Sequence, residues 1–154
     1  MAGLKRVRWE APEAERKYSR RAAWAWKENA TGVKVTMEKE AKIYVAGHRG
    51  MVGSAICRAL EKNGYTNIVT RTHGELNLCR QEEVEAFFRC EKPDYVFLAA
   101  AKVGGIMANS EALADFMYDN MILEMNVIHS AWQNGCKKLL FLGSSCIYPR
   151  MAPQ

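Results

Sequence analysis

A short apolar run, a glycine-rich turn and an amphipathic segment follow one another between residues 42 and 64. The run Lys42–Ala46 (KIYVA) is typical of a buried strand. Apolar residues then recur at helical spacing until Asn63-Gly64 stops the pattern. These residues are Val52, Ala55, Ile56, Ala59 and Leu60. A strand, a tight turn and a helix in this order begin a βαβ unit, so this segment favours a parallel sheet.

The same alternation continues along the chain. Further strands are predicted at 67–70, 94–99 and 138–142, and helices at 83–90 and 113–134, the second of which ends at Gly135. Strands that alternate with helices indicate a parallel sheet with helices on both faces. The sequence therefore predicts an α/β, Rossmann-type domain of about four strands over residues 41–154.

Residues 1–40 differ from this domain in composition. They carry ten basic side chains and six glutamates, a net charge of +4, whereas residues 41–154 have a net charge of +1. Glu, Ala, Arg and Lys favour a helix around 13–28. We expect an irregular or helical basic extension without a function of its own. Three interleaved tryptophans leave contact with nucleic acid or an acidic membrane open, and the six glutamates argue against a transit peptide.

Composition excludes several classes of protein. About half of the 154 residues are apolar, no apolar run approaches the ~20 residues that cross a bilayer, and no secretory signal peptide is recognisable. The five cysteines form no CxxC pair, which indicates reduced thiols in a cytoplasmic protein and no metal site. Because residues 41–154 are almost neutral, we expect neither nucleic acid nor a membrane as a partner of the domain.

The glycine-rich turn has the spacing GxxGxxG. It consists of Gly47, His48, Arg49, Gly50, Met51, Val52 and Gly53. Glycines permit the tight turn, the approach of a pyrophosphate to the backbone and close packing of helix on strand. The free N–H groups of the helix N-terminus then favour an anion. Between a strand and a helix, this turn predicts a dinucleotide site, and a merely structural turn is the alternative.

Charge near the expected adenosine ribose favours NADP(H). An NAD site places an acidic residue at the end of the second strand to bind the ribose 2′-OH. Here that strand ends in Arg71-Thr72-His73, and the first carboxylate is Glu75. Arg71 and Arg49 would favour a 2′-phosphate, although a solvated surface role for Arg71 stays open. A Glu75 side chain turned inward would contradict this inference.

Three strings carry a resemblance to a known family. AGHRGMVGSAI (46–56), LAAAKVGGIMAN (98–109) and LLFLGSSCIYP (139–149) resemble the GDP-L-fucose synthase family, a branch of the extended short-chain dehydrogenase/reductases. The resemblance runs from about Ala41 to Gln154 and covers the first part of a family member. It implies NADPH-dependent conversion of GDP-4-dehydro-6-deoxy-D-mannose, a GDP-linked 4-keto-6-deoxy sugar, to GDP-L-fucose. The two carbons beside the ketone are epimerised, and the ketone is then reduced by hydride transfer.

The resemblance also implies roles for single residues. Arg49 matches the 2′-phosphate contact, Ser144 the serine that hydrogen-bonds the substrate ketone, and Cys146 the base of epimerisation. Without the resemblance, Ser144 and Ser145 are typical turn formers and Cys146 a small buried hydrophobe. Ala100, Ala101, Lys102 and Val103 match the stretch beneath the nicotinamide half. The predicted cofactor-binding set comprises the turn 47–53, Arg71, His73, Ala100, Ala101, Lys102, Val103, Leu142, Gly143, Ser144 and Ser145.

Some expected parts of the family pattern are absent. The Tyr-x-x-x-Lys pair that protonates the reduced oxygen and holds the nicotinamide ribose would lie beyond Gln154, so we expect a truncated form. Tyr148 is not this tyrosine, because position 152 is Ala. A non-catalytic dinucleotide-binding or interaction module is therefore the alternative. We also expect uncovered apolar surface on the last strand and helices, and hence marginal stability.

A methionine stripe marks the longest predicted helix. Met117, Met121 and Met125 recur at i, i+4 and i+8. This spacing favours packing in the core or in a subunit interface over a ligand site. For a full-length chain, the resemblance implies a homodimer through helices of this region.

Overall fold

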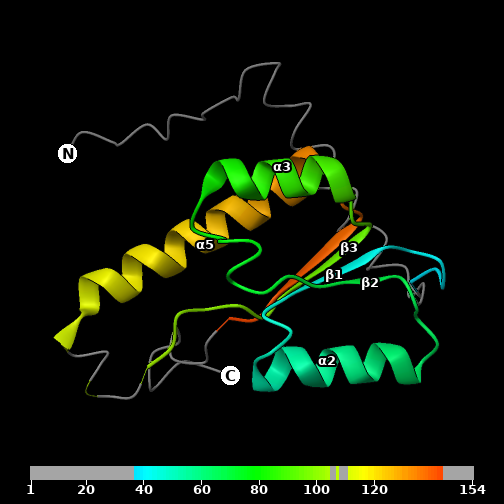
Figure 1. The fold of residues 1–154 in the computed structure, drawn as a ribbon, viewed down its shortest axis with the longest axis horizontal. Coiled ribbons are helices and arrows are strands. Elements are labelled where there is room, and N and C mark those ends of the chain that lie inside the picture. Colours follow the sequence, from blue (N-terminus) through cyan, green and yellow to red (C-terminus); the bar gives the residue numbers. More distant parts are fainter. Residues whose placement is uncertain (1–36, 105–106, 108–110, 144–154) are drawn as a thin grey trace, which may run out of the picture. The chain divides into compact units, whose positions relative to one another are not determined.

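The computed structural model of the protein describes residues 37–104, 107 and 111–143 (Figure 1). Within them the strands are β1 (Ile43–Ala46), β2 (Ile68–Val69), β3 (Tyr95–Leu98) and β4 (Lys138–Phe141), and the helices are α2 (Met51–Lys62), α3 (Gln81–Glu91) and α5 (Leu113–Gln133). All strand pairs are parallel, in the order β2-β1-β3-β4. The predicted α/β, Rossmann-type sheet is confirmed.

The two central strands set the register of the sheet. β1 pairs with β3 along its full length, from Ile43 opposite Tyr95 to Ala46 opposite Leu98. β2 is shorter than the predicted strand 67–70, since only Ile68 and Val69 pair with β1. Beyond Val69 the Thr70 carbonyl accepts a hydrogen bond from Arg71 Nη1 at 2.8 Å. A side chain thus binds a backbone group that a longer ladder would use.

Helices cover both faces of the sheet. α2 lies on one face, and α3 and α5 lie together on the other (Figure 1). The core on the α3–α5 side includes Tyr44 and Phe88, whose rings meet edge to face with centroids 5.9 Å apart. Val84 is fully buried beside them, as its helical spacing with Phe88 predicts. Each such side chain stabilises the fold by about 1.5–3 kcal/mol through burial.

The methionine stripe of α5 lies outside this core. Met117, Met121 and Met125 are 65%, 46% and 56% exposed. Within the described residues the stripe is therefore not part of the core, and its packing role stays a prediction. The expected uncovered apolar surface is present on β4 as well, where Leu140 and Phe141 are exposed; the stability of the chain stays a prediction.

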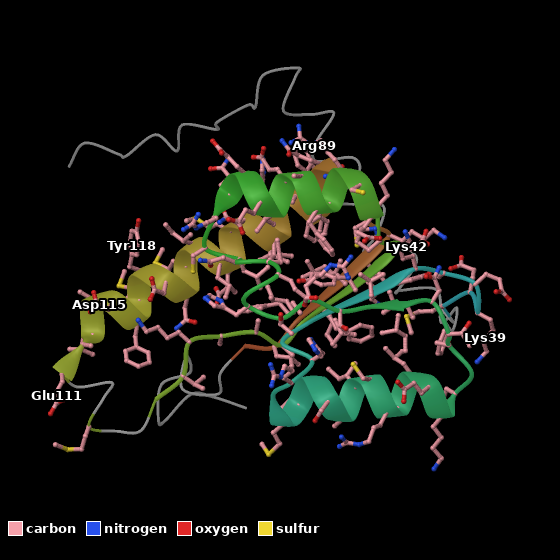
Figure 2. The ribbon with its side chains drawn as sticks, in the orientation of Figure 1. Lys39, Lys42, Arg89, Glu111, Asp115 and Tyr118 are labelled. Atoms are coloured by element: carbon pink, nitrogen blue, oxygen red, sulfur yellow. The ribbon has the colours of Figure 1, made fainter. Side chains whose placement is uncertain are left out.

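Residues 38–40 are bonded to the amino end of the sheet. The Tyr95 hydroxyl donates to Glu38 Oε2 at 2.8 Å, and Asn67 Nδ2 donates to the Glu40 carbonyl at 3.3 Å. Lys39 donates to the Asn63 carbonyl. Figure 2 shows Lys39 and Lys42 at this end. Residues 1–36 of the predicted extension lie outside the described residues, and the predicted division at residue 40 stays a prediction.

Other expectations concern single residue types. Cys57, Cys79, Cys90 and Cys136 form no disulfide bond within the described residues, and Cys146 lies outside them; the reduced state of the thiols stays a prediction. Among the described His, Cys, Asp and Glu side chains, no three gather closely enough to hold a metal ion. None of the described helices combines the length and the apolar character of a membrane span.

Candidate cofactor-binding site

The glycine turn packs against two neighbouring segments of backbone. Gly47 follows β1 with φ +82°, a conformation that side-chain-bearing residues rarely adopt. A Cβ atom at Gly47 would lie 2.7 Å from the backbone N of Ala100 and from the carbonyl group of Ala99. A Cβ atom at Gly53 would overlap the Gly47 carbonyl oxygen. The turn is thus held between the end of β3 and the first turn of α2, where glycine is required.

The N-terminus of α2 is suited to an anion. Gly50 is its N-cap, no side chain caps the helix, and no acidic residue lies in its first turn. Gly50 N donates to the Gly47 carbonyl at 3.0 Å, which closes the turn just before the helix begins. The uncapped N–H groups and the helix dipole both favour a phosphate group at this position.

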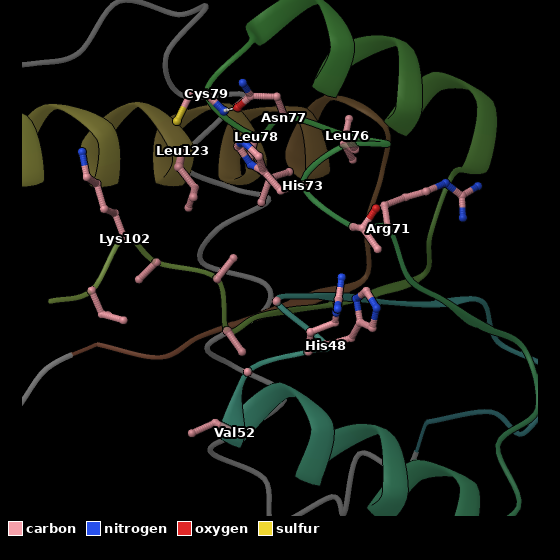
Figure 3. A pocket seen from close by; sticks show the side chains of 18 of the residues that line it. His48, Val52, Arg71, His73, Leu76, Asn77, Leu78, Cys79, Lys102 and Leu123 are labelled. Atoms are coloured by element: carbon pink, nitrogen blue, oxygen red, sulfur yellow. Dashed lines mark hydrogen bonds between the residues drawn. The ribbon is translucent and has the colours of Figure 1, made fainter.

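A cavity of about 840 Å³ opens at the carboxyl ends of β1 and β3 (Figure 3). The chain runs from β1 to β2 on one side and to β3 on the other, so this is the switch point where open α/β sheets bind ligands. Most of the predicted cofactor residues line it: Gly47, His48, Arg49, Gly50, Met51, Val52, Arg71, His73, Ala100, Ala101, Lys102 and Val103. Gly53 is buried beneath the turn, where it lets α2 pack closely.

The remaining predicted site residues do not take part in this cavity. Leu142 and Gly143 follow β4 and are not among its lining residues. Ser144, Ser145 and Cys146 lie outside the described residues. The predicted catalytic pair, Ser144 and Cys146, therefore stays a prediction.

Sequence reasoning missed one wall of the cavity. The segment after the second strand contributes Leu76, Asn77, Leu78 and Cys79, and α5 contributes Asp119 and Leu123. Figure 3 shows Leu123 and Cys79 on this side, opposite His48 and Val52. Residues 76–79 lie between β2 and α3, well past the end of β2 at Val69, and no local motif identifies them.

The ionisable side chains that line the cavity are mostly basic. His48, Arg49, Arg71, His73 and Lys102 line it, and Asp119 is the one carboxylate among the described lining residues. Asp119 is itself paired with Lys102 Nζ at 2.6 Å. An anionic ligand therefore meets no free carboxylate within this lining.

The Glu75 side chain is bonded to Thr72 in the same loop and does not line the cavity. Its Oε2 accepts hydrogen bonds from the backbone N and from Oγ1 of Thr72, both at 2.7 Å. These bonds lower the pKa of Glu75 below its usual value. The arrangement that would have contradicted a 2′-phosphate site is not observed.

Arg71 is held by α3 and is not simply solvated. Its Nη2 lies 2.7 Å from Glu91 Oε1, and its guanidinium carbon lies 5.5 Å from the centroid of the Phe87 ring. Its side chain extends away from His48 (Figure 3). Arg49, in contrast, is exposed in the glycine turn. Both arginines line the cavity, and of the two only Arg71 is paired with a carboxylate among the described residues.

His48 has a buried ring nitrogen without a partner. Nδ1 is shielded from solvent and makes no hydrogen bond with any described residue. A buried polar atom in this state is costly unless a ligand or water completes it. With the glycine cradle and the uncapped helix, it shows that the residues present fit the phosphate and ribose end of a dinucleotide.

Comparison with known proteins agrees with this geometry. Residues 43–154 match the model of the NAD dependent epimerase/dehydratase family. GDP-L-fucose synthase 1 of Arabidopsis thaliana is 64% identical over 117 residues, which are 76% of this chain and 36% of that protein. GDP-L-fucose synthase of Escherichia coli (strain K12) is 58% identical over 113 residues, 73% of this chain and 35% of that protein. The chain thus spans about a third of the length of these curated relatives.

A solved structure shows the same fold. A GDP-mannoheptose C4 reductase from Campylobacter jejuni, with NADP bound, superposes with a TM-score of 0.73 at 45% identity. The superposition covers 77% of this chain and 37% of the reductase.

Proposed function

The chain belongs to the NAD dependent epimerase/dehydratase family, and from this premise we propose that it is the NADP(H)-binding portion of a GDP-sugar epimerase-reductase. The observation that carries the proposal is the cavity beside β1. It combines a glycine cradle, an uncapped helix and basic side chains. NADP(H) is preferred to NAD(H) because Arg49 is exposed in the turn and Glu75 is bonded to Thr72. The NADP bound to the similar C4 reductase supports the same choice.

The proposed substrate is GDP-4-dehydro-6-deoxy-D-mannose and the proposed product is GDP-L-fucose. Identities of 64% and 58% to GDP-L-fucose synthases over the matched portion support this substrate class. When bound, NADPH supplies the hydride that reduces the ketone.

Two residues after β4 are proposed to carry the chemistry on the sugar. The Ser144 hydroxyl donates a hydrogen bond to the ketone oxygen, whose negative charge grows during reduction. The Cys146 thiolate removes a proton from a carbon next to the ketone, since the carbonyl acidifies that bond. We also propose a cytoplasmic location, because the four described cysteines form no disulfide bond within the described residues.

The purified chain is expected to bind NADPH at least about tenfold more tightly than NADH, because a charge-assisted hydrogen bond to the 2′-phosphate contributes about 1.5–3 kcal/mol. Fluorescence titration of both nucleotides measures this ratio. Adenosine 2′,5′-bisphosphate should compete with NADPH, since it carries the 2′-phosphate without the nicotinamide. If neither NADPH nor NADH binds to the chain, the proposed function is contradicted.

The outer face of α5 is proposed to pair with the same face of a second copy. Its exposed apolar residues are Leu113, Met117, Met121, Met125, Ile128 and Trp132. They are spaced three or four residues apart along one face about 28 Å long. An exposed apolar stripe of this length is typical of an interface, and helix pairing about a two-fold axis covers it on both copies.

Replacing Met121 with lysine is expected to raise the dimer dissociation constant at least about tenfold, because an unpaired charge in an apolar interface costs more than about 1.4 kcal/mol. Analytical ultracentrifugation measures this change. Ala59→Lys is the control, since Ala59 is exposed on α2, which covers the other face of the sheet. A dimer that is equally stable in both variants, or a chain that is monomeric at all concentrations, would contradict the pairing.

A further inference from the structure

Asn120 on α5 binds the backbone of Lys102 with both ends of its side-chain amide. Lys102 N donates to Asn120 Oδ1 at 2.7 Å, and Asn120 Nδ2 donates to the Lys102 carbonyl at 3.0 Å. Nδ2 also donates to the Phe116 carbonyl, one helical turn earlier, at 2.8 Å. Both N–H groups of the amide and its oxygen are thus used, which determines its orientation. The pair of bonds to Lys102 imitates a neighbouring strand.

Lys102 lies in a wall of the cavity that has left the sheet. β3 ends at Leu98, and Ala99 N still bonds to the Ala46 carbonyl at 3.0 Å. Residues 101–103 are exposed, and the Val103 side chain is 84% exposed. Exposed backbone with few buried contacts opens easily unless other groups hold it. The position of this wall therefore depends on attachments such as the one to α5.

The side chain of Lys102 is attached to the same turn of α5. Its Nζ lies 2.6 Å from Asp119 Oδ2 and 5.3 Å from the centroid of the Phe116 ring. The hydrogen bond with Asp119 raises the pKa of Lys102. This ion pair is partly exposed, so it contributes little to stability and tolerates several geometries. The amide bonds of Asn120 act on the backbone directly and are the more restrictive constraint.

We propose that Asn120 is a positioning residue of the cofactor pocket, which holds residues 100–103 in the geometry that the dinucleotide requires. The proposal rests on the proposed NADP(H) function. A wall that is ordered before binding removes the entropic cost of ordering it on binding. Asn120 thus favours ligands that reach residues 100–103, and it does not alter contacts made only at the glycine turn and Arg49.

Replacing Asn120 with alanine tests this role, with Asn134→Ala as the matched control. Asn134 Nδ2 donates to the Ser130 carbonyl at 2.8 Å, the same bond to the preceding turn that Asn120 makes with Phe116. Asn134→Ala therefore removes that bond near the end of α5, away from the cavity. Asn120→Asp is a second variant of nearly the same shape; it keeps an acceptor for Lys102 N and loses both donors.

Three measurements are made on the full 154-residue chain. In Asn120→Ala, hydrogen exchange of the Lys102 amide should accelerate at least about tenfold, since its acceptor is lost. The dissociation constant for NADPH should rise about tenfold, the equivalent of one or two net hydrogen bonds. The dissociation constant for adenosine 2′,5′-bisphosphate should change less than about twofold, because this ligand lacks the nicotinamide half. Asn134→Ala should leave the exchange rate of the Lys102 amide and both dissociation constants unchanged. Asn120→Asp should raise the dissociation constant for NADPH, as Asn120→Ala does.

If Asn120 had a merely structural role, Asn120→Ala would lower the affinity for NADPH and for adenosine 2′,5′-bisphosphate equally and would also lower the thermal midpoint of unfolding. This result would overturn the proposal. Unchanged NADPH affinity, or unchanged exchange at Lys102, in Asn120→Ala would overturn it as well. If Asn120→Ala does not fold, the same outcomes are judged on Asn120→Asp by its affinities for the two ligands. Failure of the unsubstituted chain to bind either ligand is a different result, since it contradicts the proposed function itself.

Discussion

Replacing Gly53 with alanine is expected to abolish NADPH binding and to destabilise the fold by about 3 kcal/mol, the upper end of the usual overpacking cost. The added Cβ would overlap the Gly47 carbonyl oxygen and lie 2.6 Å from the Gly47 carbonyl carbon and 3.0 Å from His48 Cα. All of these atoms belong to the backbone, so no side chain can rotate to relieve the clash. The turn must move away from α2, and the phosphate cradle is then lost. Urea unfolding and NADPH titration measure the two effects.

Gly74→Ala is the matched control for this change. A Cβ atom at Gly74 meets nothing within 4 Å, and the residue does not have a positive φ. The same methyl group should therefore change the free energy of unfolding by less than about 0.5 kcal/mol and leave NADPH binding intact. A Gly53→Ala variant as stable as Gly74→Ala would show that α2 does not pack on the turn as described.

The strands and helices could be predicted because each carries a local signal. The buried run of β1 is continuous, and all four of its residues are buried. Both long predicted helices were expected to stop at glycines, and Gly64 and Gly135 indeed have φ values of +78° and +77°. Such signals act within a few residues, so they are readable without knowing the fold.

The length of β2 could not be predicted from the sequence, because it depends on contacts between residues that are far apart in the chain. Thr70 has the composition of a strand residue, yet its carbonyl is bonded by the Arg71 side chain. The same guanidinium pairs with Glu91, twenty residues later in the sequence. The pattern around Arg71 shows a cation near the cofactor but cannot show which carboxylate binds it.

The wall of the cavity formed by residues 76–79 was missed for the same reason. Asn126 Nδ2 donates to the Leu78 carbonyl at 2.9 Å, and Cys79 Sγ lies 3.7 Å from the Asp119 carbonyl. These contacts join positions that are 48 and 40 residues apart. Packing of α5 beside this segment creates the wall, and no local motif marks it. The glycine turn could be predicted because its chemistry and its spacing lie in seven consecutive residues.

Replacing Arg49 with aspartate is expected to weaken NADPH binding about 100-fold and NADH binding less than about threefold. The loss combines a charge-assisted hydrogen bond to the 2′-phosphate with repulsion between the new carboxylate and that phosphate. NADH has a hydroxyl at this position and experiences neither change. Parallel titrations of the two nucleotides give the ratio directly.

Arg58→Asp is the control, because Arg58 is exposed on α2, carries the same charge and does not line the cavity. It should reduce the affinity for both nucleotides slightly and equally, through the long-range field alone. If Arg49→Asp reduced the affinities for NADPH and NADH equally, the assignment of the 2′-phosphate contact to Arg49 would be contradicted. A preference for NADPH that survives this substitution would mean that Arg71 leaves Glu91 when the phosphate binds. Glu91→Gln, which replaces the charged partner of Arg71 by a neutral one, should then strengthen NADPH binding.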